Sequence, residues 1–171
     1  MTKPDIEGAP VYYRTYLEYV KDYDLIEAFK YSGDLTQALI SSLPEDMGQY
    51  RYEEGKWSIK EVVCHVMDVE RIFAYRALRF ARNDNTALPG FEENDYAPEA
   101  NAHERSFIRL AEETARLRLA TIDLFESFTP AMMKRTGMAN KTELSVLNLG
   151  YIISGHESHH RKILTERYLN V

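Results

Sequence analysis

Apolar residues recur along this chain mostly at intervals of three and four positions, which places them on one face of an α-helix. Four long segments show this spacing, near residues 23–43, 58–82, 101–128 and 145–168. No segment shows a convincing strand pattern. The sequence therefore predicts an all-α protein, a bundle of four antiparallel helices that is connected up-down-up-down or contains one long crossover.

Local signals mark where these helices begin and end. Pro44 ends the first one, and Ser58 and Glu61 form a capping box at the start of the second. Asn101 is a plausible N-cap for the third. Residues 83–100 contain two prolines and a glycine and are expected to form a long loop, which is the best candidate for the crossover.

Composition narrows the class of protein. The chain has 171 residues and is expected to form one domain over residues 1–171, with residues 1–20 as an N-terminal arm or short helix. Its net charge of −6 argues against nucleic-acid binding and gives no sign of an anionic membrane partner. One cysteine, no signal-peptide pattern and no apolar run of about 18 residues favour a cytoplasmic protein without a membrane span.

Three of the five histidines fall within residues 156–160, in the last predicted helix. Each helical residue advances by about 100° around the axis, so His160 lies about 40° from His156, inside the apolar stripe. His159 lies about 60° away on the other side, at the edge of that stripe. His156 and His160 are therefore predicted to point into the bundle together, as two imidazoles that can bind one metal ion.

A third ligand has to come from another helix, because a catalytic zinc ion usually takes three protein ligands. His65 faces inward with the apolar stripe of the second predicted helix, although a single inward histidine is often only a hydrogen-bonded core residue. Glu61 and Asp68 flank it at i−4 and i+3. Either carboxylate is a candidate catalytic base or could orient the imidazole, and direct ligation by Asp68 stays open.

The remaining histidines and the cysteine have simpler interpretations. His103 is expected to be exposed near the start of the third helix. His159 is expected to be solvated or to support the site from outside, and Cys64, which lies off the metal-facing direction, to be a packed thiol.

Other charged side chains could serve a substrate. Arg76, Arg79 and Arg161 are candidate contacts for an anionic group, and Glu157 is a candidate base. A solvated helix charge is the alternative for each of them, and it is the preferred interpretation of Arg161 and Glu157.

From about residue 20 to its end, the chain resembles the DinB/YfiT-like superfamily of metal-dependent hydrolases. The matching segments are 56–65 (KWSIKEVVCH), 70–82 (ERIFAYRALRFAR), 88–91 (LPGF) and 150–160 (GYIISGHESHH). The resemblance implies a four-helix bundle with a divalent metal, zinc or nickel, near one end of its core. It maps the family's three metal-binding histidines onto His65, His156 and His160.

The resemblance also implies a homodimer and a small-molecule substrate, but it does not fix a reaction. Some relatives resemble S-transferases that use a low-molecular-weight thiol such as bacillithiol, whereas others are named hydrolases. A second hypothesis is a non-catalytic, stress-type protein that binds a metal or small ligand. A third is a dimerisation bundle with a structural metal, which would need His159 or Asp68 as a fourth ligand.

Overall fold

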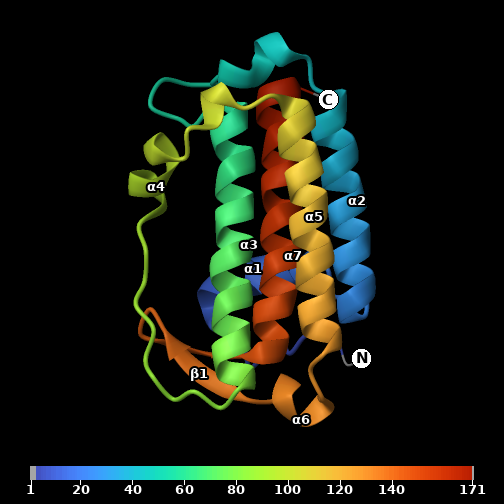
Figure 1. Cartoon of the computed structure of the whole chain (residues 1–171), viewed down its shortest axis with the longest axis vertical. Coiled ribbons are helices and arrows are strands. Elements are labelled where there is room, and N and C mark those ends of the chain that lie inside the picture. The colour runs from blue at the N-terminus through green and yellow to red at the C-terminus, as the bar shows by residue number, and fades with distance from the viewer. Residues whose placement is uncertain (1–2, 171) are drawn as a thin grey trace.

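The structure is a computed structural model that describes residues 3–170, and four long helices form its core (Figure 1). These helices are α2 (Leu25–Ser42), α3 (Ile59–Ala81), α5 (Phe107–Glu126) and α7 (Val146–Ile163). The prediction of a four-helix bundle is therefore confirmed. Within the described part of the chain, no helix is long and apolar enough to cross a membrane.

The helices run up, down, down and up in chain order (Figure 1). Both α2 and α3 pack against α5 and α7, so α2 and α3 lie diagonally opposite each other. The neighbours α3 and α5 are parallel, and so are α2 and α7 (Figure 1). The crossover through residues 83–100 is present, as predicted, because the chain must return along the bundle before α5. The expectation that all four helices are antiparallel to their neighbours is wrong.

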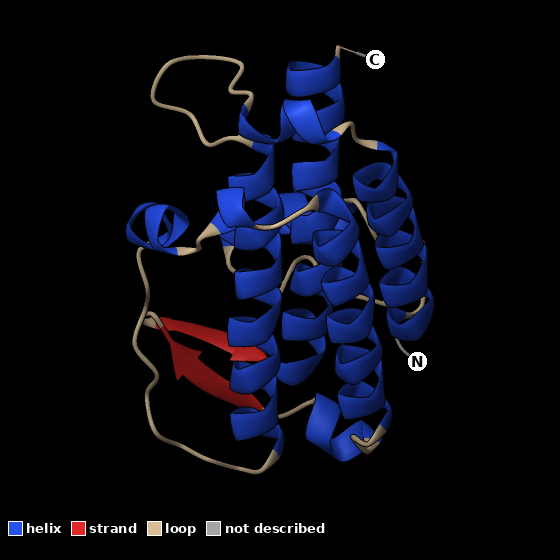
Figure 2. Ribbon diagram, turned by 45° about the horizontal axis from the view of Figure 1, so that its top comes forward, coloured by secondary structure: helices blue, strands red, loops and turns tan. Residues whose placement is uncertain are grey.

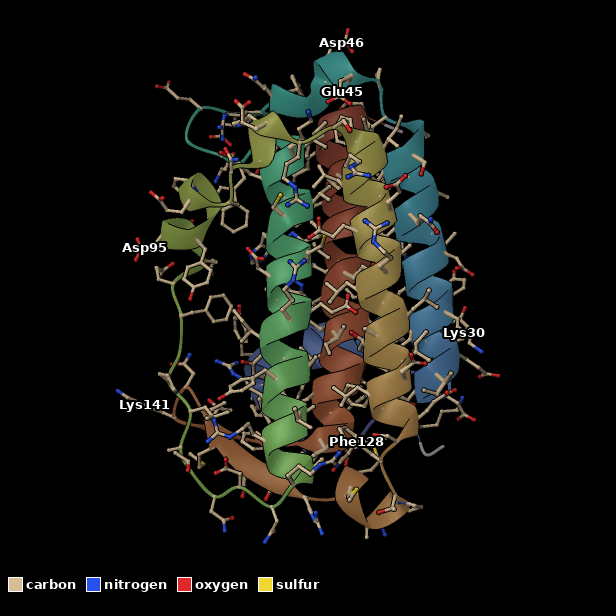
Figure 3. The ribbon with its side chains drawn as sticks, viewed as in Figure 1. Lys30, Glu45, Asp46, Asp95, Phe128 and Lys141 are labelled. Atoms are coloured by element: carbon tan, nitrogen blue, oxygen red, sulfur yellow. The ribbon has the colours of Figure 1, made fainter. Side chains whose placement is uncertain are left out.

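The predicted capping box starts α3. The Ser58 backbone N–H donates to Glu61 Oε2 at 2.7 Å, and the Glu61 N–H donates to Ser58 Oγ at 3.3 Å. The start predicted for the third helix is wrong, since Ser106 caps α5 and Asn101 adopts a left-handed conformation with φ of 50°. Glu45, at the top of the bundle in Figure 3, accepts a hydrogen bond from the Phe107 N–H at 3.0 Å.

Two of the connections between the long helices contain short helical segments. The segment before α3 includes the 3₁₀ helix η1 (Glu45–Gln49). The crossover includes α4 (Glu93–Glu99), which stands beside α3 (Figure 1), and the 3₁₀ turn η2 (Ala102–Glu104). These segments are too short for helical periodicity to reveal them, because each spans two turns or fewer.

The expectation of no strand is also wrong. After the short helix α6 (Pro130–Met133), β1 (Thr136–Ala139) and β2 (Thr142–Ser145) form an antiparallel hairpin (Figure 2). Its two turn residues, Asn140 and Lys141, have φ of 48° and 61°, which is the backbone of a tight hairpin turn. A bridge between Leu88 and Ala139 attaches the crossover to the hairpin.

The helix α1 (Val11–Glu18) packs against α7. Gly155 permits this contact, because a Cβ atom at that position would lie 2.1 Å from the backbone oxygen of Tyr16. Beyond α7 the chain continues as a π-helical segment, η3 (Leu164–Leu169), in which the Tyr168 hydroxyl donates to the Trp57 carbonyl oxygen at 2.7 Å. These contacts fix Tyr16 and Trp57 beside the C-terminal half of α7.

Candidate metal centre

Three histidine rings from two helices converge in the bundle. His65 projects from α3 to meet His156 and His160 of α7, and the Nε2 atoms of His65 and His156 are 3.1 Å apart. One nitrogen from each of the three rings lies within 4.8 Å of the others. Two nitrogens that bind one tetrahedral zinc ion at about 2.0–2.1 Å lie about 3.3 Å apart. The spacing of the three rings therefore fits a single metal ion.

Burial keeps these rings in the form that can bind a metal. It lowers the pKa of His65 to about 4, and together with the neighbouring rings of His65 and His159 it lowers the pKa of His160 to about 3. The pKa of His156 is also well below its usual value, chiefly because of burial. All three imidazoles are therefore neutral at pH 7, so each keeps a nitrogen lone pair for a metal.

The rings lie at a pocket with a volume of about 530 Å³, which is a size typical of small-molecule sites. Its walls come from α1, α3, α7, the start of α4 and the hairpin. Besides the three histidines, the lining includes Pro10, Tyr12, Tyr13, Tyr16, Trp57, Val69, Phe73, Arg76, Phe91, Glu92, Glu93, Asn140, Thr142, Ile152 and His159. The site is thus a pocket of mixed lining, in which aromatic rings and several polar side chains surround three neutral imidazoles.

The two carboxylates that flank His65 in sequence make their hydrogen bonds to other partners. Both Glu61 oxygens accept hydrogen bonds from Arg51. Burial raises the pKa of this carboxyl, but the hydrogen bonds outweigh burial, so the pKa lies below its usual value. Asp68 pairs with Arg71 at 3.2 Å, and burial raises its pKa. Neither side chain lines the pocket. The structure therefore brings the three histidines together without bringing Glu61 or Asp68 to them.

The other histidines and the cysteine lie outside the three-ring group. His159 lines the pocket, with its ring centroid 5.4 Å from that of Tyr16. His103 is partly buried rather than exposed, and its Nε2 lies 3.4 Å from Glu61 Oε1. Cys64 is buried as expected, and burial raises the pKa of its thiol.

The interpretation of Glu157 and Arg161 as solvated charges is wrong. The Glu157 side chain is 1% exposed, and its Oε2 lies 2.9 Å from Nη1 of the buried Arg118. Arg161 is partly buried and donates hydrogen bonds to the Ser32 carbonyl oxygen and the Thr36 hydroxyl, at 3.2 and 3.3 Å. Both side chains belong to a polar cluster on the side of α7 that faces α2 and α5. A helical wheel for α7 alone could not place those neighbours.

Sequence reasoning missed the aromatic wall supplied by α1 and Trp57. The Tyr16 ring lies edge-on to His156, with centroids 5.4 Å apart, and the Trp57 ring centroid is 4.6 Å from that of His65. The signal for α1 was the run VYYRTYLEY, whose tyrosines at positions 12 and 16 share a helix face. An isolated short helix does not reveal which helix it will contact.

The up-down-down-up bundle and its three-histidine site define a class of helical proteins. Comparison with known proteins identifies that class. Residues 28–164 match the model of the DinB superfamily, and the chain belongs to this superfamily. The chain is 30% identical over 160 residues to a protein of Geobacillus thermodenitrificans (strain NG80-2) named "Putative metal-dependent hydrolase". That alignment covers 89% of this chain and 84% of the relative.

The fold is similar to that of YfiT from Bacillus subtilis, with a TM-score of 0.76. YfiT is described as "a probable metal-dependent hydrolase with an unusual four-helix bundle topology". The two sequences are 16% identical, and the match covers 85% of each chain. The resemblance drawn from the sequence is therefore confirmed. The three-histidine cluster and the named relatives together suggest a divalent metal as the cofactor.

Proposed function

We propose that this protein is a metal-dependent hydrolase of a small molecule, with zinc or nickel held by His65, His156 and His160. The observation that carries the proposal is the convergence of three largely buried, neutral imidazoles at one pocket. A set of three nitrogen ligands with no carboxylate or thiolate is typical of catalytic zinc and leaves room for water or substrate. The names of the relatives support the same class of reaction.

When bound, such an ion lowers the pKa of water and polarises a substrate carbonyl. The chain's own residues would orient the substrate and handle the proton. Tyr16 and Trp57 place aromatic rings against His156 and His65 and would shield these imidazoles from bulk water. His159 lines the pocket outside the three-ring group, and we assign it the role of proton acceptor. Glu61 and Asp68 would act indirectly, by holding the α3 segment that presents His65.

A thiol S-transferase is the second candidate for the same site. Soft thiolate ligands bind zinc well, so the donor set that suits a hydrolase also suits a low-molecular-weight thiol. The pocket volume of about 530 Å³ favours this candidate as well, because it can hold a thiol and a second small substrate together. A non-catalytic protein that binds a metal or small ligand is the third candidate.

Metal analysis of freshly purified protein, coupled to two activity assays, distinguishes these candidates. We expect about one zinc or nickel ion per chain, as the three-ligand site requires. Hydrolysis of a panel of small esters and amides should stop after chelation and return when the metal is restored. Conjugation of a low-molecular-weight thiol to an electrophile without any hydrolysis would support the transferase instead. Metal binding with neither activity would support the binding protein.

We also propose that the protein is a cytoplasmic homodimer. Several large apolar side chains remain exposed on the surface, among them Ile108 and Leu119 of α5, with 70% and 62% of their area accessible. A shared face on a second copy would cover such residues. Light scattering is expected to give a mass of about 40 kDa, twice the chain mass of 19.9 kDa, at micromolar concentrations. A mass of one chain over that range would contradict the dimer.

A further inference from the structure

Arg76 is a buried cation without a carboxylate partner. It is only 4% exposed, and within the described part of the chain its guanidinium donates one hydrogen bond, from Nη2 to the Pro89 carbonyl oxygen at 3.0 Å. Within residues 3–170, no ion pair joins Arg76 to an acidic side chain, and burial lowers its pKa. A buried charge is costly unless an opposite charge or hydrogen bonds offset the loss of water.

Two other arginines, the buried Arg118 and the more exposed Arg79, have carboxylate partners. Arg118 is paired with two carboxylates, Glu70 and Glu157, and Arg79 is paired with Asp84. Arg161, which is partly buried, donates to two oxygens of α2. Arg76 is more deeply buried than Arg79 and Arg161, has no ion pair among the described residues, and lies in the wall of the pocket.

Aromatic rings fix the guanidinium of Arg76 in place. It lies 5.0 Å from the centre of the Phe73 ring and 5.8 Å from that of Phe91. Contacts of this kind stabilise the cation through the ring faces but use none of its N–H donors. The remaining donors are free to bind a planar anion such as a carboxylate, for which the guanidinium fork is well suited.

Arg76 shares a helix face with His65. Both side chains line the same pocket, with Val69 and Phe73 between them along α3. Eleven residues of α-helix turn the chain to within about 20° of its starting direction and advance it by about 16 Å. The two residues therefore stand at opposite ends of one wall, with an apolar stretch between them.

Two acidic residues also line the pocket, and neither neutralises Arg76. Glu92 accepts hydrogen bonds from the backbone and side chain of Asn94 and so caps α4. The charge of Glu93 contributes to the raised pKa values of Tyr13 and Tyr16, which places it near α1. The positive charge of Arg76 thus remains available to a ligand.

We propose that Arg76 is a binding residue for an anionic group, a carboxylate or a phosphate, at the end of the substrate remote from the reacting bond. This inference rests on the proposed function, because it takes the three-histidine site as the place of reaction. The substrate class is then an elongated molecule with an apolar or aromatic middle and one anionic end. The apolar side chains of Val69 and Phe73, which lie between His65 and Arg76 along α3, match the middle of such a molecule.

Matched small ligands test the proposal in metal-free protein, in which no anion can bind to a metal ion. Calorimetric titration with benzoate, phenyl phosphate and neutral benzamide compares molecules of similar shape and different charge. We expect one of the anions to bind at least about tenfold more tightly than benzamide, as one charge-assisted contact would give. Tighter binding of benzoate identifies a carboxylate, and tighter binding of phenyl phosphate identifies a phosphate.

Variants assign the effect to a residue. Arg76→Met should reduce the ratio of anion affinity to benzamide affinity to about one, and Arg76→Lys should retain part of the wild-type ratio. Arg79→Met should leave the ratio unchanged, because Arg79 pairs with Asp84 outside the pocket. Equal binding of anions and benzamide to the wild type, or no binding of either anion, would overturn the proposal without any variant. An unchanged preference in a folded Arg76→Met protein would also overturn it. If His156→Ala loses metal binding but still prefers the anion to benzamide, the anion-binding role of Arg76 stands independently of the metal site.

Discussion

Replacing His65, His156 or His160 with alanine is expected to remove most of the metal that copurifies with the protein. Two imidazoles bind a divalent ion much more weakly than three, and the rings of this site lie within reach of one ion. Metal quantification on each purified variant measures the loss directly. The wild type should retain about one ion per chain under the same conditions.

His159→Ala is the matched control, because His159 lies on the same helix and lines the same pocket without joining the three-ring group. It should keep its metal and lose turnover, as expected if His159 accepts a proton in the reaction. If His159→Ala loses the ion while His160→Ala keeps it, the ligands are a pair at i and i+3 and the assignment is wrong.

Thermal unfolding gives a second measurement of the same effect. A metal that binds only the folded state stabilises it by about 4 kcal/mol when its concentration is a thousand times the dissociation constant. The melting temperature of the wild type and of His159→Ala should therefore rise when metal is added. The melting temperatures of the three ligand variants should respond far less.

Much of the candidate site was visible in the sequence, because helical geometry is local. Once residues 145–168 were assigned to a helix, the angles of His156 and His160 followed from their separation of four positions. The inward direction of His65 followed from its own apolar stripe. That the three rings meet required the packing of α3 against α7, which the family resemblance implied and the structure shows.

The parts that could not be predicted depend on contacts between distant segments. The sequence Asn140-Lys141 lacks the glycine that usually marks a two-residue hairpin, so the turn and both strands went unnoticed. The parallel arrangement of α3 and α5 depends on the path of the crossover, which periodicity does not describe. The sequence could not show that Glu157 is a buried and paired charge, because its partner Arg118 lies 39 positions away in sequence.

The ion cluster around Arg118 gives the prediction with the largest expected effect on stability. Arg118 donates two hydrogen bonds to Glu70, at 2.9 and 2.8 Å, and lies 2.9 Å from Glu157. The Nη1 atom of Arg118, which is the atom nearest Glu157, donates hydrogen bonds to the Phe29 carbonyl oxygen and the Ser32 hydroxyl. Burial alone would lower the pKa of Arg118, but Glu157 and Glu70 more than offset this and raise it. One guanidinium thus joins α2, α3, α5 and α7.

Arg118→Met is expected to destabilise the protein by about 3–5 kcal/mol, because it leaves two buried carboxylates without their counter-charge. Methionine has a similar helix propensity to arginine, so the effect reports the cluster rather than the helix. Arg116→Met on the same helix is the control, since Arg116 is 64% exposed and forms a surface ion pair with Glu112, and its loss should cost less than about 0.5 kcal/mol. Urea unfolding of both variants measures the difference.

Adding Glu70→Gln and Glu157→Gln to Arg118→Met should recover part of the lost stability, because the two glutamines carry no charge into the core. Recovery would show that the cost comes from unpaired carboxylates and not from a packing defect left by the arginine. Equal destabilisation by Arg118→Met and Arg116→Met would contradict this account.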